Sequence, residues 1–202
     1  VFIATRADPP LPLARWKSRS RLLEIRADRL RFTMLESRTF LQHSMAANLD
    51  EGQLRELHAK TEGWISGLRL GVLSLQHVRD PGAGIHSLSG ASSEIAAYLT
   101  SEVLRQLPPD TQRFLLETSI LEKLCAPLCS HLTGPDGQKQ LEKLAAQNLF
   151  LEPLDSEGTW YRYHSLFSEL LRFRLQRFHP EKITELHRQA SAWFSAEGWF
   201  DM

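Results

Sequence analysis

The sequence lacks the short motifs that mark many phosphate-handling and hydrolytic enzymes. It contains no GxxxxGK phosphate loop followed by Ser or Thr and no GxGxxG fingerprint. HExxH and GxSxG are also missing. Ser, His and Asp residues are scattered, and their types alone define no catalytic set. We therefore expect no complete catalytic site, and we expect this chain not to be an enzyme by itself.

Cysteine and excess charge are scarce as well. The only cysteines are Cys125 and Cys129, which would share one helix face but lack the further ligands of a zinc site. We expect them to be buried free thiols. Lys plus Arg and Asp plus Glu number 24 each, for a formal net charge of zero. This balance argues against a surface that holds a nucleic-acid backbone, because such affinity comes mainly from excess cations.

Long apolar runs are missing too, so no segment is expected to cross a bilayer. Residues 1–5, VFIAT, have no basic region before them and no cleavage site, so we expect this segment not to be a signal peptide. The cytoplasm is the expected location. Hydrophobic residues make up 42% and charged residues 24%, as in chains that fold around a packed core.

The first third of the chain changes from a strand pattern to a helix pattern. Two apolar runs, 1–5 and 22–25, predict strands, and 11–18 predicts a short helix between them. Because two strands form no stable sheet alone, residues 1–32 predict the edge of an α/β domain in a piece cut from a larger protein.

Residues 33–90 predict a helical domain. Thr33 and Glu36 have the spacing of a capping box at the start of a helix over 34–47. Two further helices are predicted, over 50–61 and 65–77. Residues 80–90 are rich in Gly, Ser and Pro and predict a loop.

Residues 91–178 predict a winged-helix domain. Helices are expected over 92–106, 110–121, 126–132, 136–147 and 164–177. Residues 149–154 and 159–164 flank a four-residue turn and predict a β-hairpin wing. Residues 179–202 predict the start of a helical arm, with a helix over 180–197 that ends at Gly198. The fold class is therefore mainly α.

The aromatic and basic side chains have several interpretations. The aromatic residues are expected to pack in the winged-helix core: Trp160, Tyr161, Tyr163, Phe167 and Phe173. Two basic stretches suit solvated helix faces or salt bridges, although they could also meet phosphates: Arg15, Lys17, Arg19 and Arg21, and Arg172, Arg174, Arg177 and His179.

Four segments carry a resemblance to a known family. They are VFIATRADPPLPLAR (1–15), LEIRADRLRFT (23–33), TEGWISGLRL (61–70) and WYRYHSLF (160–167). In this order they resemble MalT-like regulators of the LuxR family, a class of signal-transduction ATPases that control transcription. The resemblance implies a nucleotide-binding domain, a helical domain, a winged-helix domain, a helical-repeat sensor and a C-terminal DNA-binding helix-turn-helix.

The resemblance also implies nucleotide contacts at Arg6, Gly63, Trp64, Arg162 and His164. Arg6 would read the terminal phosphate, and His164 would contact the β-phosphate of ADP from the winged-helix domain. Each has a structural alternative: a surface ion pair for Arg6, a core position for Trp64, a packing role for His164 and cover of the wing for Arg162. At residues 63–68 the match to the GxP motif of related switch ATPases is loose, because Ile65 stands in place of the proline.

The partners follow from the same resemblance. The parent protein would bind ATP or ADP with magnesium and an inducer, would oligomerise when active, and would bind DNA through a domain outside this chain. No nucleotide is expected to stay on this piece alone, and no membrane is involved. Two alternatives stay open: a protein-interaction scaffold, and a winged-helix DNA-binding module. The helix over 136–147 would be a poor groove reader, because Lys139 and Lys143 are balanced by Asp136 and Glu142.

Overall fold

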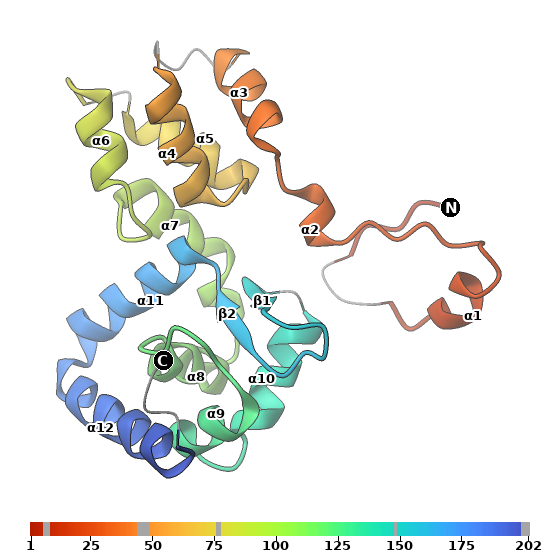
Figure 1. The fold of residues 1–202 in the computed structure, drawn as a ribbon, viewed down its shortest axis with the longest axis vertical. Coiled ribbons are helices and arrows are strands. Elements are labelled where there is room, and N and C mark those ends of the chain that lie inside the picture. Colours follow the sequence, from red (N-terminus) through yellow and green to blue (C-terminus); the bar gives the residue numbers. More distant parts are fainter. Residues whose placement is uncertain (6–8, 44–48, 76–77, 148, 199–202) are drawn as a thin grey trace.

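The computed structural model describes residues 1–5, 9–43, 49–75, 78–147 and 149–198. The described chain is mainly helical and has one two-stranded antiparallel hairpin (Figure 1). In chain order the elements are α1 (Leu13–Lys17), α2 (Ala27–Leu30), α3 (Met34–His43), α4 (Glu51–Thr61), α5 (Ile65–Leu75), α6 (Pro81–Ser87), α7 (Ser93–Glu102), the 3-10 helix η1 (Leu104–Gln106), α8 (Pro109–Thr118), α9 (Ala126–Thr133), α10 (Gly137–Ala146), β1 (Leu151–Pro153), β2 (Tyr161–Tyr163), α11 (Ser165–Phe178) and α12 (Pro180–Ala196).

The two strands predicted near the N-terminus are not formed. Residues 1–5 and 22–25 are irregular, and Phe2 and Leu23 are 101% and 86% exposed. An apolar run becomes a strand only where neighbouring strands pair with its backbone groups, and the described residues contain only the β1–β2 sheet. The short helix expected over 11–18 is present as α1 (Figure 1).

Helices α3 to α6 pack together at one end of the molecule (Figure 1). The predicted capping box is confirmed: the Thr33 amide donates to the Glu36 carboxylate at 2.8 Å, and the Glu36 amide donates to the Thr33 hydroxyl at 3.3 Å. The loop predicted over 80–90 is wrong, because α6 forms there. Asp80 caps its first turn, Pro81 starts it, and the buried side chain of Ile85 anchors it.

The predicted winged-helix order is present in the second part of the chain. Helices α8, α9 and α10 precede the wing, in which Leu151 pairs with Tyr163 and Pro153 with Tyr161. The helix expected over 92–106 divides into α7 and η1. Most of the named aromatic residues pack in or against the core, but Phe173 is 42% exposed, so its predicted core position is wrong. The predicted domain limits at 32, 90 and 178 stay predictions.

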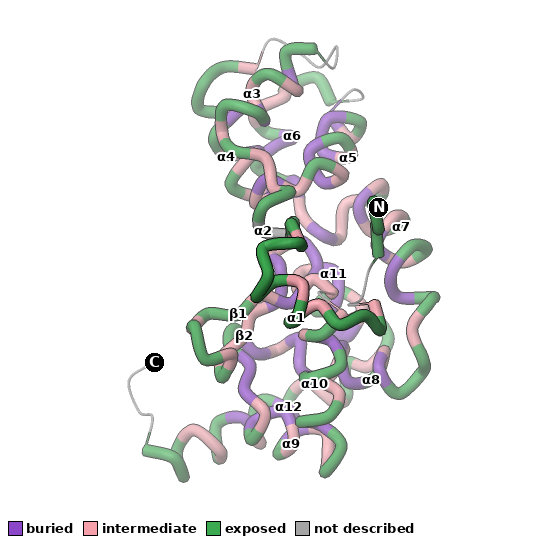
Figure 2. Tube along the Cα trace, turned by 90° about the vertical axis from the view of Figure 1, so that its right-hand side faces the viewer, coloured by how far each residue is buried: buried purple, intermediate pink, exposed green. Residues whose placement is uncertain are grey.

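The two parts meet along α11. Helices α4 and α7 both pack against it, and buried residues continue from one part into the other (Figure 2). Gly90, in the segment between α6 and α7, lies so close to α11 that a Cβ atom there would be 1.8 Å from the Leu166 carbonyl oxygen. Its amide donates to the Glu169 carboxylate at 2.7 Å. This close backbone approach fixes the connection to α11. None of the helices in the described residues is long and apolar enough to span a membrane.

Candidate functional site

Four of the five predicted site residues come together at one junction. Gly63 and Trp64 lie in the turn between α4 and α5. Arg162 lies in β2, and His164 immediately precedes α11. Arg6 lies outside the described residues. The junction therefore joins the helical part to the wing.

The α4–α5 turn has an unusual backbone. Glu62 follows the last residue of α4 with φ 49° and ψ 34°, and Gly63 has φ 71°. The left-handed region favours glycine, so Glu62 carries some backbone strain. The Gly63 carbonyl accepts from the Phe32 amide at 2.9 Å, and a Cβ on Gly63 would be 2.3 Å from the Phe32 carbonyl oxygen. The turn is thus closed against the segment before α3.

Four charged side chains form the centre of the junction, which we call the charge cluster: Arg31, Glu62, Glu152 and Arg162. Arg162 binds both carboxylate oxygens of Glu62 through two hydrogen bonds of 3.0 and 2.8 Å. It also contacts Glu152 at 2.5 Å, and Arg31 bridges Glu62 and Glu152. Residues from three distant segments are therefore held together by alternating charges.

The N-terminus of α11 completes the surroundings of the Glu62 carboxylate. The Ser165 amide donates to Glu62 Oε1 at 3.0 Å, and the Ser165 hydroxyl donates to the Lys60 carbonyl at 3.1 Å. A carboxylate at a helix N-terminus is stabilised by the free amide groups and by the helix dipole. Burial alone would raise the pKa of Glu62, but the bonds from Arg162 and Ser165 outweigh it and lower the pKa to about 2.

His164 is buried beside this cluster, with 3% of its surface exposed. Its Nε2 lies 3.1 Å from the Thr61 carbonyl oxygen, which can only accept, so Nε2 carries a proton. Its Nδ1 is buried and has no hydrogen-bond partner among the described residues. Burial lowers the pKa of His164, although Glu62 and the Thr61 carbonyl oppose the shift. The ring is therefore neutral near pH 7, with an unsatisfied nitrogen.

Aromatic rings cover the same junction. The Trp64 ring lies edge-on to Phe150 at 5.3 Å and to His164 at 5.8 Å, and it also contacts Tyr98. Phe150 stacks on Phe167 at 5.0 Å and has φ 51°, a second non-glycine residue in the left-handed region at this junction. Trp64 thus packs among rings from α7 and from the wing and its flanks. This packing fits the alternative interpretation of Trp64 as a core residue.

Sequence reasoning did not identify Arg31, Glu62, Glu152 and Ser165 as site residues. Three of them lie inside the segments that carried the family resemblance, at 23–33, 61–70 and 160–167. Their charges pair only after folding, since Arg162 and Glu62 are 100 residues apart. Glu62 and Ser165 lie directly beside the predicted residues Gly63 and His164, and this proximity was the available signal. No local pattern indicates that Glu62 pairs with Arg162.

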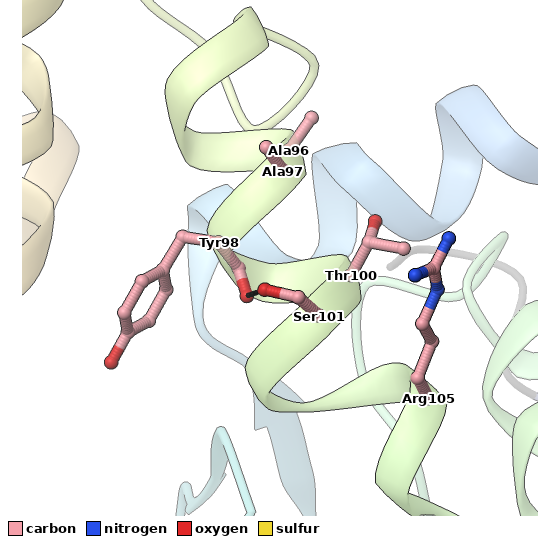
Figure 3. A pocket seen from close by; sticks show the side chains of 6 residues that line it. All are labelled: Ala96, Ala97, Tyr98, Thr100, Ser101 and Arg105. Atoms are coloured by element: carbon pink, nitrogen blue, oxygen red, sulfur yellow. Dashed lines mark hydrogen bonds between the residues drawn. The ribbon is translucent and has the colours of Figure 1, made fainter.

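The other candidates offer less chemistry. A hollow of about 510 Å³ beside α7 is lined by small side chains together with Tyr98 and Arg105, which point in different directions and do not converge on one ligand (Figure 3). Among the described residues, no group of three His, Cys, Asp or Glu side chains could hold a metal ion. Cys125 and Cys129 are free and buried, and burial raises the pKa of both thiols.

Two arginines of the second basic stretch and the exposed side of α10 make contacts within the molecule. The Arg172 guanidinium donates to the Ser119 and Leu121 carbonyls, and Arg174 lies over the Phe178 ring. On α10, the Gln138 amide donates to Glu142 in the exposed face. These contacts favour internal bracing over contact with nucleic acid.

A phosphate group fits the donors of the junction. Arg31 and Arg162 present guanidinium groups, whose geometry matches phosphate as well as carboxylate. The Ser165 amide opens a 14-residue helix, and the His164 Nδ1 is a buried polar atom without a partner among the described residues, which becomes a donor when the ring takes a second proton. These residues would hold the phosphates of a nucleotide, whereas the described residues offer no purpose-built group for its magnesium ion.

Comparison with known proteins relates the chain to MalT-type regulators. Residues 100–183 match the model of the MalT winged helix domain. The serine/threonine-protein kinase PknK of Mycobacterium tuberculosis is 36% identical over 190 residues, which cover 94% of this chain and 17% of the kinase. The HTH-type transcriptional regulator MalT of Yersinia enterocolitica is 35% identical over 205 residues, covering 98% of this chain and 22% of the regulator. That of Cronobacter sakazakii is 32% identical over 205 residues, with the same coverage. The chain therefore spans about a fifth of the length of these relatives.

Proposed function

Because residues 100–183 belong to the MalT winged helix domain family, and because the chain is homologous to MalT regulators and PknK over most of its length, we propose that it is a regulatory module. The module would act as a nucleotide-dependent switch in a signal-responsive transcription regulator. Its helical and winged-helix parts would close over bound ADP, and exchange for ATP would let them separate.

One observation carries this proposal: the charge cluster and His164 join the α4–α5 turn to the wing at a place rich in phosphate-binding groups. The nucleotide would supply a terminal phosphate whose presence or absence distinguishes the two states. Arg162 and His164 would bind from the winged-helix part, and Gly63 and Trp64 would shape the opposite wall. Arg6 keeps its proposed role as the reader of the terminal phosphate.

Other properties of the parent protein belong to the same proposal. The chain would not turn over ATP by itself, because it has no phosphate loop. Magnesium would accompany ATP in the parent, an inducer would bind elsewhere, and the active form would oligomerise. DNA would be bound outside this chain, in the cytoplasm. The balanced charge of α10 and its intrahelical contact make direct reading of DNA by this helix of the winged-helix domain the weaker alternative.

The test is the retention of ADP by the intact protein after substitution of His164. His164→Gln keeps a donor near the Nε2 position for the Thr61 carbonyl and removes Nδ1. Loss of a charge-assisted hydrogen bond predicts ADP release that is faster by about tenfold or more, measured with a fluorescent ADP analogue. His86→Ala is the matched control, since that side chain is 87% exposed on α6. Unchanged release from a folded His164→Gln protein would remove the switch role of His164.

A further inference from the structure

We propose that Arg31, Arg162 and the N-terminus of α11 form an anion site whose resident occupant is the carboxylate of Glu62, and that phosphate competes with this carboxylate. The choice of phosphate as competitor rests on the proposed function, whereas the site itself rests on the geometry.

The donors around Glu62 resemble those of a bound oxyanion. Arg162 donates through both terminal nitrogens, and the Ser165 amide donates along the axis of α11. Arg31 adds a longer contact of 3.5 Å. Because a guanidinium fork binds carboxylate and phosphate in the same way, the Glu62 side chain occupies the place that a phosphate would take.

An independent feature of the same helix end supports a ligand there. His164, the residue before Ser165, is buried, and its Nδ1 has no partner among the described residues. A buried polar atom without a partner is costly, and an ion or ligand bound beside it is one of the explanations for such an atom. Phosphate carries more negative charge than the Glu62 carboxylate that it would replace, so it would also favour a second proton on the His164 ring, which would then donate through both nitrogens.

The charge balance requires exchange and not addition. The cluster contains two guanidinium groups, Arg31 and Arg162, and two carboxylates, Glu62 and Glu152. A phosphate added beside both carboxylates would place surplus negative charge in a half-buried site. When the Glu62 carboxylate leaves, the cluster keeps its balance more closely.

The exchange would have a structural consequence. Glu62 is the residue of the α4–α5 turn whose side chain bonds to Arg162 of the wing and to Ser165 of α11. Its release would break both contacts. Phosphate entry in place of Glu62 would therefore loosen the helical part from the wing, which corresponds to the separation that the proposed function assigns to ATP and not to the ADP-bound closed state. Glu62 acts in this proposal as an internal competitor that sets how much anion is needed to open the junction.

The experiment measures binding of inorganic phosphate to the intact protein by calorimetry, at constant ionic strength with chloride. Glu62→Gln keeps the size of the side chain but removes its charge, so phosphate should bind about tenfold more tightly than in the wild type. The double variant Glu62→Gln with Arg162→Gln should lose this gain. Glu185→Gln, which breaks an exposed ion pair within α12, should behave as the wild type does.

Unchanged phosphate affinity in folded Glu62→Gln would overturn the proposal, as would a gain that persists without Arg162. If Glu62→Gln does not fold, hydrogen exchange of the wild type decides. Phosphate should then speed exchange in residues 60–65 and 162–166 relative to chloride, and equal rates would overturn the proposal. A gain in phosphate binding together with unchanged ADP release in His164→Gln would leave the anion site standing and remove the nucleotide switch. Unchanged phosphate binding together with faster ADP release in His164→Gln would overturn the present proposal and leave the nucleotide switch standing.

Discussion

Replacement of Gly63 by alanine perturbs the junction at its most constrained backbone position. Gly63 has φ 71°, and an added Cβ would lie 2.3 Å from the Phe32 carbonyl oxygen, where real Cβ atoms stay beyond 3.0 Å. Left-handed backbone costs an alanine about 1–2 kcal/mol. Displacement of Phe32 and weakening of its 2.9 Å bond to the Gly63 carbonyl cost about 1–2 kcal/mol more.

The expected loss of stability is therefore about 2–4 kcal/mol, which for a chain of this size lowers the Tm by roughly 5–15 °C. Thermal unfolding followed by circular dichroism measures it. Gly52→Ala is the control, because Gly52 lies in α4 and the atom near its Cβ, at 3.2 Å, is the capping oxygen Oδ1 of Asp50, which must shift by only a few tenths of an ångström. The higher helix propensity of alanine offsets this shift, so the control should change stability by less than about 1 kcal/mol. A Gly63→Ala protein as stable as the Gly52→Ala control would refute the structural role of this turn.

Three further predictions concern stability at low pH, the contact of Gly90 with α11 and the reactivity of the two thiols. Glu62 has a pKa of about 2 in the folded protein against an ordinary 4.5, so its contribution to the unfolding free energy is complete above pH 4.5 and is lost as the pH falls toward 2. Glu62→Gln should flatten the pH dependence of the unfolding free energy measured in urea over that range. An unchanged slope against pH would contradict the lowered pKa of Glu62. Gly90→Ala should lower the midpoint of urea unfolding strongly, because its Cβ would meet backbone atoms of α11 that no rotamer change can move; a midpoint within error of the wild type would show that α11 can retreat. Cys125 and Cys129 should react with iodoacetamide far more slowly in the folded protein than in urea, as followed by mass spectrometry, since both are buried with raised pKa; equal rates would contradict their burial.

Local signals in the sequence predicted the elements whose stability is local. The Thr33–Glu36 capping box and the wing both depend on residues a few positions apart, and both are present. Helix α6 was missed because its Gly-rich composition outweighed the stronger signals of a capping Asp80, Pro81 at its start and one buried anchor, Ile85. The strand pattern of 1–5 misled because an apolar run cannot supply the neighbours that a strand needs.

The candidate site could be predicted only in part. Resemblance directed attention to Gly63, Arg162 and His164, which the structure brings to one junction. Their partners are a backbone carbonyl at Thr61 and a carboxylate at Glu62, and neither the pairing nor the left-handed turn is visible in a local pattern. Long-range ion pairs depend on the complete fold, so sequence spacing carries no record of them.

The distance along the chain between Glu62 and Arg162 also sets an order of events during synthesis. The two residues are 100 positions apart. At ribosomal speeds, Arg162 is therefore made about 5–20 seconds after Glu62. In that interval α4 and α5 can already pack, but the left-handed turn between them has none of its stabilising cations from the wing. The bonds between the helical part and the wing therefore form last, after the wing has been synthesised.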